Sequence, residues 1–281
     1  MEKNIAVISI LIFAFISLTG NFLPVYPNEL EQTVNGFTLY GFGDTGQKTW
    51  EVFGKTADVF SDQIRLNDLI GTIYGEEEIV LTAERGNFNK AQNAVHLEEN
   101  VIITTESGAK LTTDYLDWDN NTSLVTTDAP VDIKRDNITT TGIGIKGNTN
   151  LESIDLKKDV KVVINDKKGT VVVTCSGPLS IDYAANIAVF NNDVVVDDGE
   201  SRMYADSMEV FFDTAPSDNK TDKSLAGKRG KINKIIARDN VKIIRQDNVS
   251  FSDQAVYNAE DKTVTLIGKP RLIIYSAPQK M

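Results

Sequence analysis

The stretch Ala255–Ile274, AVYNAEDKTVTLIGKPRLII, decides the fold because it combines alternating apolar residues with a polar turn and a kink. Apolar residues at every second position, as in VTLI, predict strands with one buried face. The segment NAEDK between two such runs consists of residues that favour turns. Pro270 removes a backbone N–H in the middle of the second run, which indicates a bend or a bulge. The stretch therefore predicts a hairpin whose returning strand is bent.

The bend recurs along the chain at intervals of about 30 residues, with one longer interval. The counterparts of Gly268–Arg271 are Glu99–Val101, Ala129–Val131, Lys158–Val160, Asn192–Val194 and Asp239–Val241. The longest interval contains the polar insertion Thr214–Lys231, which predicts a loop. Between the bends lie short runs rich in Val, Ile and Thr, and none of them has an apolar period of 3.6 residues with helix caps.

These repeats predict an all-β chain of stacked strand units, because a single unit of this kind cannot bury its apolar face alone. We expect an elongated structure of two twisted antiparallel sheets with a repeated corner. Its interior would be apolar along its whole length. Its end strands would leave backbone donors and acceptors free unless another chain pairs with them.

The composition argues against some classes of partner and of site. The 281 residues carry a formal charge of −11, which argues against a nucleic-acid partner, since non-specific affinity for phosphates comes from Lys and Arg. The single cysteine, Cys175, excludes an internal disulfide and any CxxC motif. It lies in the apolar run VVVTCSG, which favours a buried, inert thiol.

The N-terminus differs from the rest of the chain. No charged residue occurs from Asn4 to Asn28, and Ile5–Leu18 is almost wholly apolar. Extended through Tyr26, this segment is long enough to cross a bilayer, whereas Ile5–Leu18 alone fits the core of a signal peptide. Residues 1–28 therefore predict an N-terminal transmembrane anchor, with a cleaved signal sequence as the alternative. Under either interpretation, the chain is expected to be exported.

Two motifs that resemble catalytic or metal sites are better explained structurally. The only histidine, His96, lies in a strand-like run with no metal partner or nucleophile at a fixed spacing. The segment Asp117–Asn121 begins like a calcium loop, but Thr122 stands where the sharp turn needs glycine, and Asp128 stands where a glutamate is expected. We therefore predict no catalytic residue, no metal site and no cofactor, and the chain is not expected to be an enzyme.

The segment Gly142–Gly147 matches GxGxxG, the pattern of dinucleotide-binding loops. That function requires a following helix, and here another turn and strand follow. We interpret Gly142, Gly144 and Gly147 as positions where the sheet bends or where another backbone docks closely.

An exported, anchored chain with these repeats resembles a known family. The segment from about Trp50 to Ile164 resembles LptC, the single-pass inner-membrane component of lipopolysaccharide export, and the N-terminal anchor fits the same family. The motifs that carry the resemblance are TWEVFGKTADV, VHLEENVIITTESGAKLTTDYLDWD and TTTGIGIKGNTNLESIDLKKDVKVVI. The motifs LSIDYAANIAVFNNDVVVDDGESRMYADSMEVFF and SDQAVYNAEDKTVTLIGKPRLII, within residues 177–274, are similar to the periplasmic LptA/OstA-like repeats. The familiar anchored protein ends soon after the segment that corresponds to Gly147–Ile164, whereas this chain continues. It therefore resembles an anchor protein fused to part of its own bridge.

The resemblance implies an anchor over residues 1–28, an LptC-like β-jellyroll over residues 29–165 and an LptA/OstA-like continuation over residues 166–281. It implies a jellyroll open along one side that holds the acyl chains of lipopolysaccharide. It further implies an inner-membrane location with the bulk of the chain in the periplasm. The implied partners are lipopolysaccharide, the inner-membrane ABC transporter of the Lpt system, and another β-jellyroll protein, LptA- or LptD-like, joined by end-to-end strand pairing.

The apolar face of the strands provides the candidate lipid-binding groove. Its expected residues are Leu81, Leu97, Val101, Ile103, Leu111, Tyr115, Val131, Ile133, Val160, Val162, Ile181, Tyr183, Val210, Phe212, Val241, Ile243, Phe251 and Leu266. Each of them has a closed core as its alternative. Transport along this groove would be passive in this chain, because the sequence contains no phosphate-binding loop. The competing hypothesis is a membrane-tethered β-solenoid, structural or adhesive, whose interior is tightly packed and dry.

Overall fold

The computed structural model describes residues 30–43, 45–75, 78–106, 108–119, 121–122, 124–135, 137–148, 153–166, 169–182, 184–213 and 231–274. These residues form strands and the turns between them, and no helix occurs among them. The strands are β1 (Leu30–Phe42), β2 (Lys48–Phe60), β3 (Gln63–Ile73), β4 (Ile79–Asn89), β5 (Ala94–Thr105), β6 (Lys110–Asp119), β7 (Leu124–Arg135), β8 (Ile138–Asn148), β9 (Ser153–Asp166), β10 (Gly169–Cys175), β11 (Leu179–Asp182), β12 (Ile187–Asp197), β13 (Ser201–Asp213), β14 (Lys231–Arg245), β15 (Asn248–Asn258), β16 (Thr263–Ile267) and β17 (Arg271–Ile273). The all-β prediction is confirmed.

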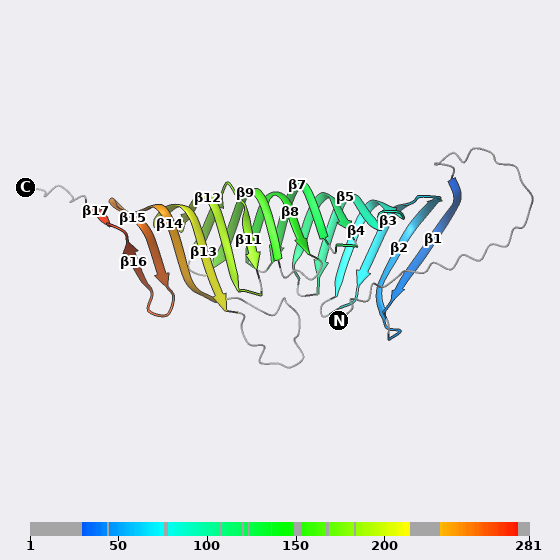
Figure 1. Ribbon diagram of the computed structural model, residues 1–281, viewed down its shortest axis with the longest axis horizontal. Coiled ribbons are helices and arrows are strands. Elements are labelled where there is room, and N and C mark those ends of the chain that lie inside the picture. Colours follow the sequence, from blue (N-terminus) through cyan, green and yellow to red (C-terminus); the bar gives the residue numbers. More distant parts are fainter. Residues whose placement is uncertain are drawn as a thin grey trace, which may run out of the picture.

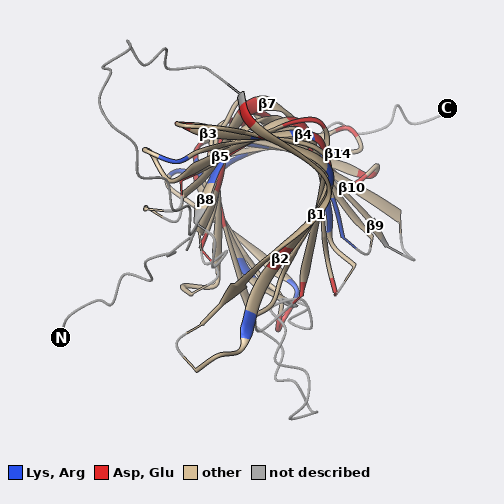
Figure 2. Ribbon diagram, turned by 90° about the vertical axis from the view of Figure 1, so that its right-hand side faces the viewer, with Lys and Arg blue, Asp and Glu red and all other residues tan. Residues whose placement is uncertain are grey.

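The strands form one antiparallel sheet in which each strand pairs with the next along the chain. At two places in the sheet, two short consecutive strands take the place of one long strand. Strands β10 and β11 both pair with β9 and β12, and strands β16 and β17 both pair with β15. Figure 1 shows the strands in chain order along the long axis, with β1 at one end and β17 at the other. Seen along that axis, the strands curve around it (Figure 2).

The sheet is folded along the predicted bends. Left-handed backbone occurs there at Glu99 and Asn100, Asn192 and Asp193, and Asp239 and Asn240, with φ between 52° and 63°. Asn and Asp tolerate this conformation better than most residues. At Gly268 and Lys269, φ is 83° and 51°. The pairing register shifts at the same places, for example between Glu98 and Val101, and also between Thr127 and Pro130. The predicted bends are thus confirmed.

Each bend divides its strand into two limbs. In β5 the first limb is Ala94–Glu98 and the second limb is Val101–Thr105; we use first limb and second limb for these segments and for the segments paired with them in neighbouring strands. The two sheets predicted from the sequence are therefore the two limbs of one hydrogen-bonded sheet. The reason is that each strand runs through its bend instead of ending at it.

The core lies where the limbs meet. The valines that follow the bends, Val101, Val131, Val160, Val194 and Val241, are all at most 3% exposed. Three clusters of buried residues follow one another along the axis, and the middle one extends from β7 to β13. The core therefore continues across residue 165, where the sequence suggested a boundary between two units.

The predicted anchor, residues 1–28, lies outside the described residues, as does the predicted polar loop up to residue 230. Among the residues that the structure does describe, no helix is long and apolar enough to cross a membrane.

Candidate functional site

In several strands, burial falls off with distance from the bend. In β5, Leu97 and Val101 flank the bend and are 3% and 0% exposed, whereas Val95 and Ile103, one inward-facing position further out, are only half-buried. In β12, Phe190 and Val194 flank the bend and are likewise buried, whereas Ala188 and Val196, further from the bend, are half-buried. The limbs thus close on each other at the bend and leave their outer apolar residues partly open. We use the word trough for the inner face of the sheet between the two limbs, where these apolar residues are partly open.

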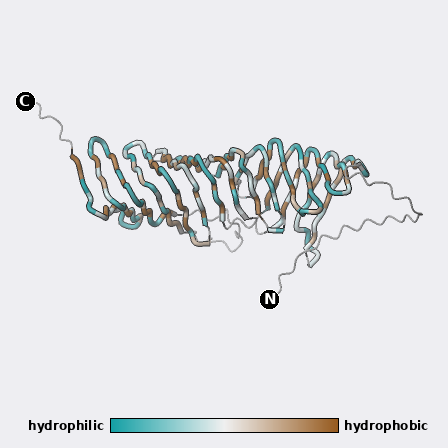
Figure 3. The backbone as a smooth tube through the Cα atoms, turned by 45° about the horizontal axis from the view of Figure 1, so that its top comes forward, coloured by the Kyte–Doolittle hydropathy of each residue, from teal (hydrophilic) through white to brown (hydrophobic). Residues whose placement is uncertain are grey.

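The pairing register aligns the inward-facing residues further from the bends into two rows, most of them half-open, with Val162 and Val173 buried. We call them the first-limb row and the second-limb row. The first-limb row runs through Phe88, Val95, Trp118, Val125, Gly147, Ile154, Ile181, Ala188, Val210 and Ile235. The second-limb row runs through Leu81, Ile103, Leu111, Ile133, Thr140, Val162, Val173, Val196, Met203 and Ile243. Figure 3 shows the matching alternation of hydrophobic and hydrophilic residues along the strands.

Register and alternation place most of the sequence-predicted groove residues on the inner face. These are Leu81, Leu97, Val101, Ile103, Leu111, Val131, Ile133, Val160, Val162, Ile181, Val210, Phe212, Val241, Ile243 and Leu266. Those next to the bends form the closed floor of the trough, and those further out form its walls. Tyr183 lies outside the described residues.

Two predicted groove residues, Tyr115 and Phe251, lie on the opposite face. The Tyr115 hydroxyl accepts a hydrogen bond from the backbone N–H of Asp128 at 3.2 Å, and its ring lies 5.9 Å from the ring of His96. The guanidinium of Arg271 covers the ring of Phe251 at 5.3 Å. Both residues stand close to a bend, where the register shift interrupts the simple alternation on which the prediction rested.

Sequence reasoning missed several wall residues, among them Trp118, Ile154, Val196, Met203 and Ile235. A usable signal was present for part of them. The residue two positions after each corner valine faces inward, as Ile103 does after Val101, and the same count would have identified Val196 after Val194. For the first-limb row the distance from the bend varies, so no such count was available.

The opposite face of the sheet carries exposed ion pairs beside scattered apolar residues such as Phe53 and Ile70. His96 Nδ1 lies 2.6 Å from the Asp117 carboxylate, and Arg85 contacts both Glu98 and Glu99. No group of residues that could hold a metal ion occurs among the described residues. Exposed pairs of this type contribute little to stability, so we interpret this face as a solvated surface.

The glycines of the GxGxxG match give room to neighbouring strands. Gly144 has φ +76°, and a Cβ there would lie 2.7 Å from Cδ of Lys157, whose amine reaches Asp128. A Cβ on Gly142 would lie 3.1 Å from a methyl group of Leu156, and one on Gly147 would lie 3.3 Å from the carbonyl oxygen of Ser153. Strands β8 and β9 are therefore in close contact at these positions, and the segment lies within the sheet.

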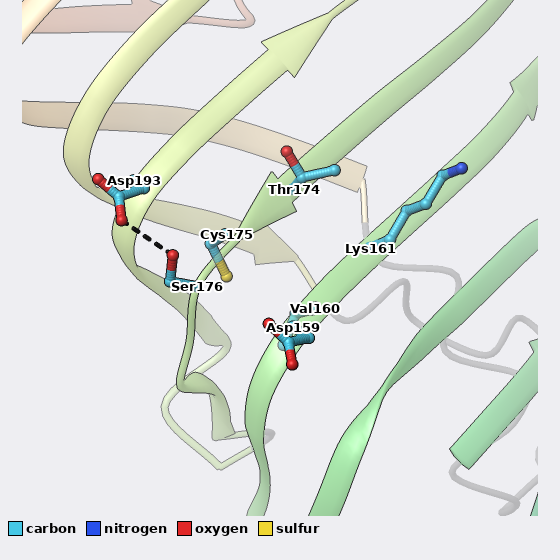
Figure 4. A pocket seen from close by; sticks show the side chains of 7 residues that line it. All are labelled: Asp159, Val160, Lys161, Thr174, Cys175, Ser176 and Asp193. Atoms are coloured by element: carbon cyan, nitrogen blue, oxygen red, sulfur yellow. Dashed lines mark hydrogen bonds between the residues drawn. The ribbon is translucent and has the colours of Figure 1, made fainter. Parts of the chain in front are cut away.

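Two shallow pockets lie along the bends, of about 640 Å³ and about 320 Å³. Figure 4 shows the smaller one, which is lined by residues of β9, β10 and the bend of β12, with Ser176 Oγ donating a hydrogen bond to Asp193. It contains Cys175, but burial raises the pKa of this thiol, which disfavours the reactive thiolate. No described residue supplies a general base to it within hydrogen-bond reach. The trough, and not these pockets, is the candidate functional site.

Comparison with known proteins gives two family matches. The family described as lipopolysaccharide-assembly, LptC-related, matches residues 5–165, and the family described as LptA/(LptD N-terminal domain) LPS transport protein matches residues 175–279. The comparison with curated protein sequences gives no match. Among solved structures, the chain is similar to LptH of Pseudomonas aeruginosa, the LptA-homologous periplasmic component of its lipopolysaccharide transport device. That similarity has 12% identity and a TM-score of 0.25, and covers 60% of this chain and 95% of LptH.

Proposed function

The chain belongs to the LptC-related family of lipopolysaccharide-assembly proteins, joined to an LptA/LptD-like segment, and on this premise we propose that it moves lipopolysaccharide across the periplasm. The lipid's acyl chains lie in the trough, between the first-limb row and the second-limb row. The polar parts of the lipid stay outside it. The observation that supports this most strongly is the apolar wall, half-open at most of its positions, that continues through both family segments, from β4 to β14.

The energetics agree with a trough of this kind. Burying acyl carbons contributes about 0.8 kcal/mol per CH₂, so a single acyl chain contributes on the order of 10 kcal/mol. A lipid with several such chains does not cross an aqueous gap unassisted. A continuous apolar wall lets each chain slide forward while it remains out of water, so no step along the trough requires full exposure.

The proposed direction of transport runs from the predicted anchor toward the end at β17. In this proposal, residues 1–28 anchor the protein in the inner membrane by a single span, and the rest lies in the periplasm as the segments 29–165 and 166–281, which share one continuous core. Lipid enters from the inner-membrane ABC transporter of the Lpt system, whose ATP hydrolysis supplies the energy. Newly loaded lipid pushes earlier lipid toward the outer membrane.

The two end strands provide the contacts with partners. Along its outer edge, β1 has no pairing strand among the described residues, and its Leu39, Tyr40 and Phe42 are exposed. At the other end, β17 exposes Leu272 and Ile273 in the same way. Edges of this type accept a further strand by β-augmentation. The end at β17 would take an LptA- or LptD-like jellyroll, and the end at β1 would dock on the transporter.

Two pairs of neighbouring isoleucines allow a matched test. Ile103 faces the trough and Ile102 the opposite side, and on β14 the same holds for Ile243 and Ile244. We expect Ile103→Asp or Ile243→Asp to block lipopolysaccharide transport to the cell surface in cells depleted of the native protein, because a carboxylate in the wall is costly to bury against an acyl chain. Ile102→Asp and Ile244→Asp should leave transport intact at equal protein levels. Equal transport in all four variants would contradict the proposal and favour the closed structural rod.

A further inference from the structure

Two arginines occupy equivalent positions at the rim of the trough. Each is the fourth residue after a corner valine: Arg135 follows Val131 in VDIKR, and Arg245 follows Val241 in VKIIR. Strand pairing continues without a register shift over both segments, so each arginine lies on the same face of its strand as its valine. That face is the inner one, because both valines are buried in the core.

The two arginines lie beyond the apolar wall. Ile133 and Ile243 stand between them and the floor, and four residues of a strand span about 13 Å. Strands β7 and β14 end at the arginines, and each chain then turns into the next strand. Both side chains therefore leave the sheet from its inner face at the mouth of the trough.

The guanidinium of Arg245 is exposed and takes part in no hydrogen bond, ion pair or aromatic contact within the part of the chain that the structure describes. Other arginines differ in this respect. Arg85, Arg202 and Arg238 contact carboxylates, and Arg271 covers an aromatic ring. The donors of Arg245 are therefore available to a ligand.

The carboxylates near Arg245 belong to hairpin turns. Asp198 and Glu200 lie in the turn before β13, whose Ser201 pairs with Arg245, and Asp247 lies in the turn after β14. The Asp198 carboxylate already accepts hydrogen bonds from Ser201 and from the N–H of Glu200. In a chain with a net charge of −11, such groups repel an anion from most of the surface. The favourable place for an anion here is the guanidinium itself.

A guanidinium presents paired N–H donors that match two oxygens of a phosphate. We propose that Arg245, and Arg135 at the equivalent place, bind the phosphate of an acylated glucosamine phosphate whose acyl chains lie in the trough. This inference rests on the proposed function and adds to it the class of head group that the rim selects. Strands β7 and β14 are six strand spacings apart, about 29 Å along the sheet, so the two arginines hold successive lipid molecules.

The test uses the full chain in phosphatidylcholine nanodiscs and two defined probes. One is a glucosamine phosphate with ester- and amide-linked acyl chains, and the other is the same acylated glucosamine without the phosphate. The double variant R135Q/R245Q should bind the phosphorylated probe about tenfold more weakly, because a charge-assisted hydrogen bond is lost at each site. It should bind the unphosphorylated probe as tightly as the native chain does.

The matched control is K134Q/K242Q, which removes the same number of positive charges from the outer faces of the same two strands. Lys134 is adjacent to Arg135, and Lys242 lies over the ring of Tyr204 on the outer face. This control should bind both probes like the native chain. R135K/R245K retains the charges but not the paired donors, so its affinity for the phosphorylated probe should be intermediate.

The outcomes separate the two levels of the account. The role of the arginines is refuted, and the trough stands, if R135Q/R245Q weakens both probes equally or weakens neither. The same holds if K134Q/K242Q weakens the phosphorylated probe as much as R135Q/R245Q does. If neither probe binds to the native chain, the proposed function is refuted together with the role of the arginines.

Discussion

Two alanine substitutions on β9 distinguish a trough from a closed core. Leu156 and Ile154 are two residues apart on the same face of the strand, and their partners on β11 are Leu179 and Ile181. Leu156 is 1% exposed and belongs to the floor, whereas Ile154 is half-buried and belongs to the first-limb row. Each substitution removes three carbon atoms, so any difference between the two reflects the surroundings.

The expected magnitudes follow from this burial. Three fully buried carbons are worth about 2.4 kcal/mol at about 0.8 kcal/mol each, and the cavity left behind raises the loss for Leu156→Ala to about 3–4 kcal/mol. For Ile154→Ala we expect a smaller loss, of about 1–2 kcal/mol, because part of that side chain already contacts water in the lipid-free protein. Lipid binding should change in the opposite order: Ile154→Ala removes contact with the acyl chain, and Leu156→Ala does not.

The assay is urea unfolding of the full chain, followed by far-ultraviolet circular dichroism, together with titration of the acylated glucosamine phosphate. Leu156→Ala is to be compared with Ile154→Ala at the same protein concentration. If Ile154→Ala loses about 3 kcal/mol or more and binds lipid like the native chain, the wall is in fact a closed core. The structural rod would then be the better explanation of the fold.

Three further predictions concern local features. Gly177→Ala should destabilise the protein by about 3 kcal/mol, because φ is +100° and the new Cβ would lie 2.6 Å from the carbonyl oxygen of Lys157. Gly199→Ala is the control: φ is +83° there, but the space around a Cβ is open, so the loss should be about 1 kcal/mol. Equal losses in urea unfolding would contradict this prediction. Burial raises the pKa of Cys175, so at pH 8 a disulfide reagent should label the thiol only after unfolding, and rapid labelling of the native chain would count against the buried thiol. Hydrogen bonds from Gly199 N–H and Arg202 hold the pKa of Asp197 below its ordinary 3.8, so its contribution to stability is present above about pH 4 and is lost as the pH falls through the lowered pKa. The difference in unfolding free energy between Asp197→Asn and the native chain should therefore shrink from pH 5 to pH 2. A constant difference would refute the assignment.

The bends could be predicted from the sequence because their chemistry is local. Asn and Asp in left-handed backbone interrupt runs of alternating apolar residues, as at Asn192–Asp193 and Asp239–Asn240, and the valine that follows is buried each time. Apart from the longer connection between β13 and β14, the strand order follows from the short turns between successive strands. These features need no knowledge of distant contacts.

The wall of the trough could be predicted only in part, because it depends on distance between limbs. Val101 and Ile103 have the same alternation and a similar composition around them, yet the first is wholly buried and the second is half-open. Tyr115 shows a second limit. A register shift lies beside it, so counting alternate residues through the bend assigns Tyr115 to the wrong face of the sheet. That Arg245 has no carboxylate partner among the described residues depends on the neighbouring strands, and periodicity does not report it.

The most direct test of the central claim is photocrosslinking in living cells with a photoreactive residue at Ile103, Ile102, Ile243 or Ile244. Each pair consists of adjacent residues on opposite faces of one strand, so position along the axis is closely matched, and lipid outside the trough would label the outward-facing member. The account predicts lipopolysaccharide adducts at Ile103 and Ile243 and none at Ile102 and Ile244. Adducts at Ile103 alone would contradict a trough that continues through both halves, and no adduct at any of the four positions in the folded protein would contradict lipid transport by this chain.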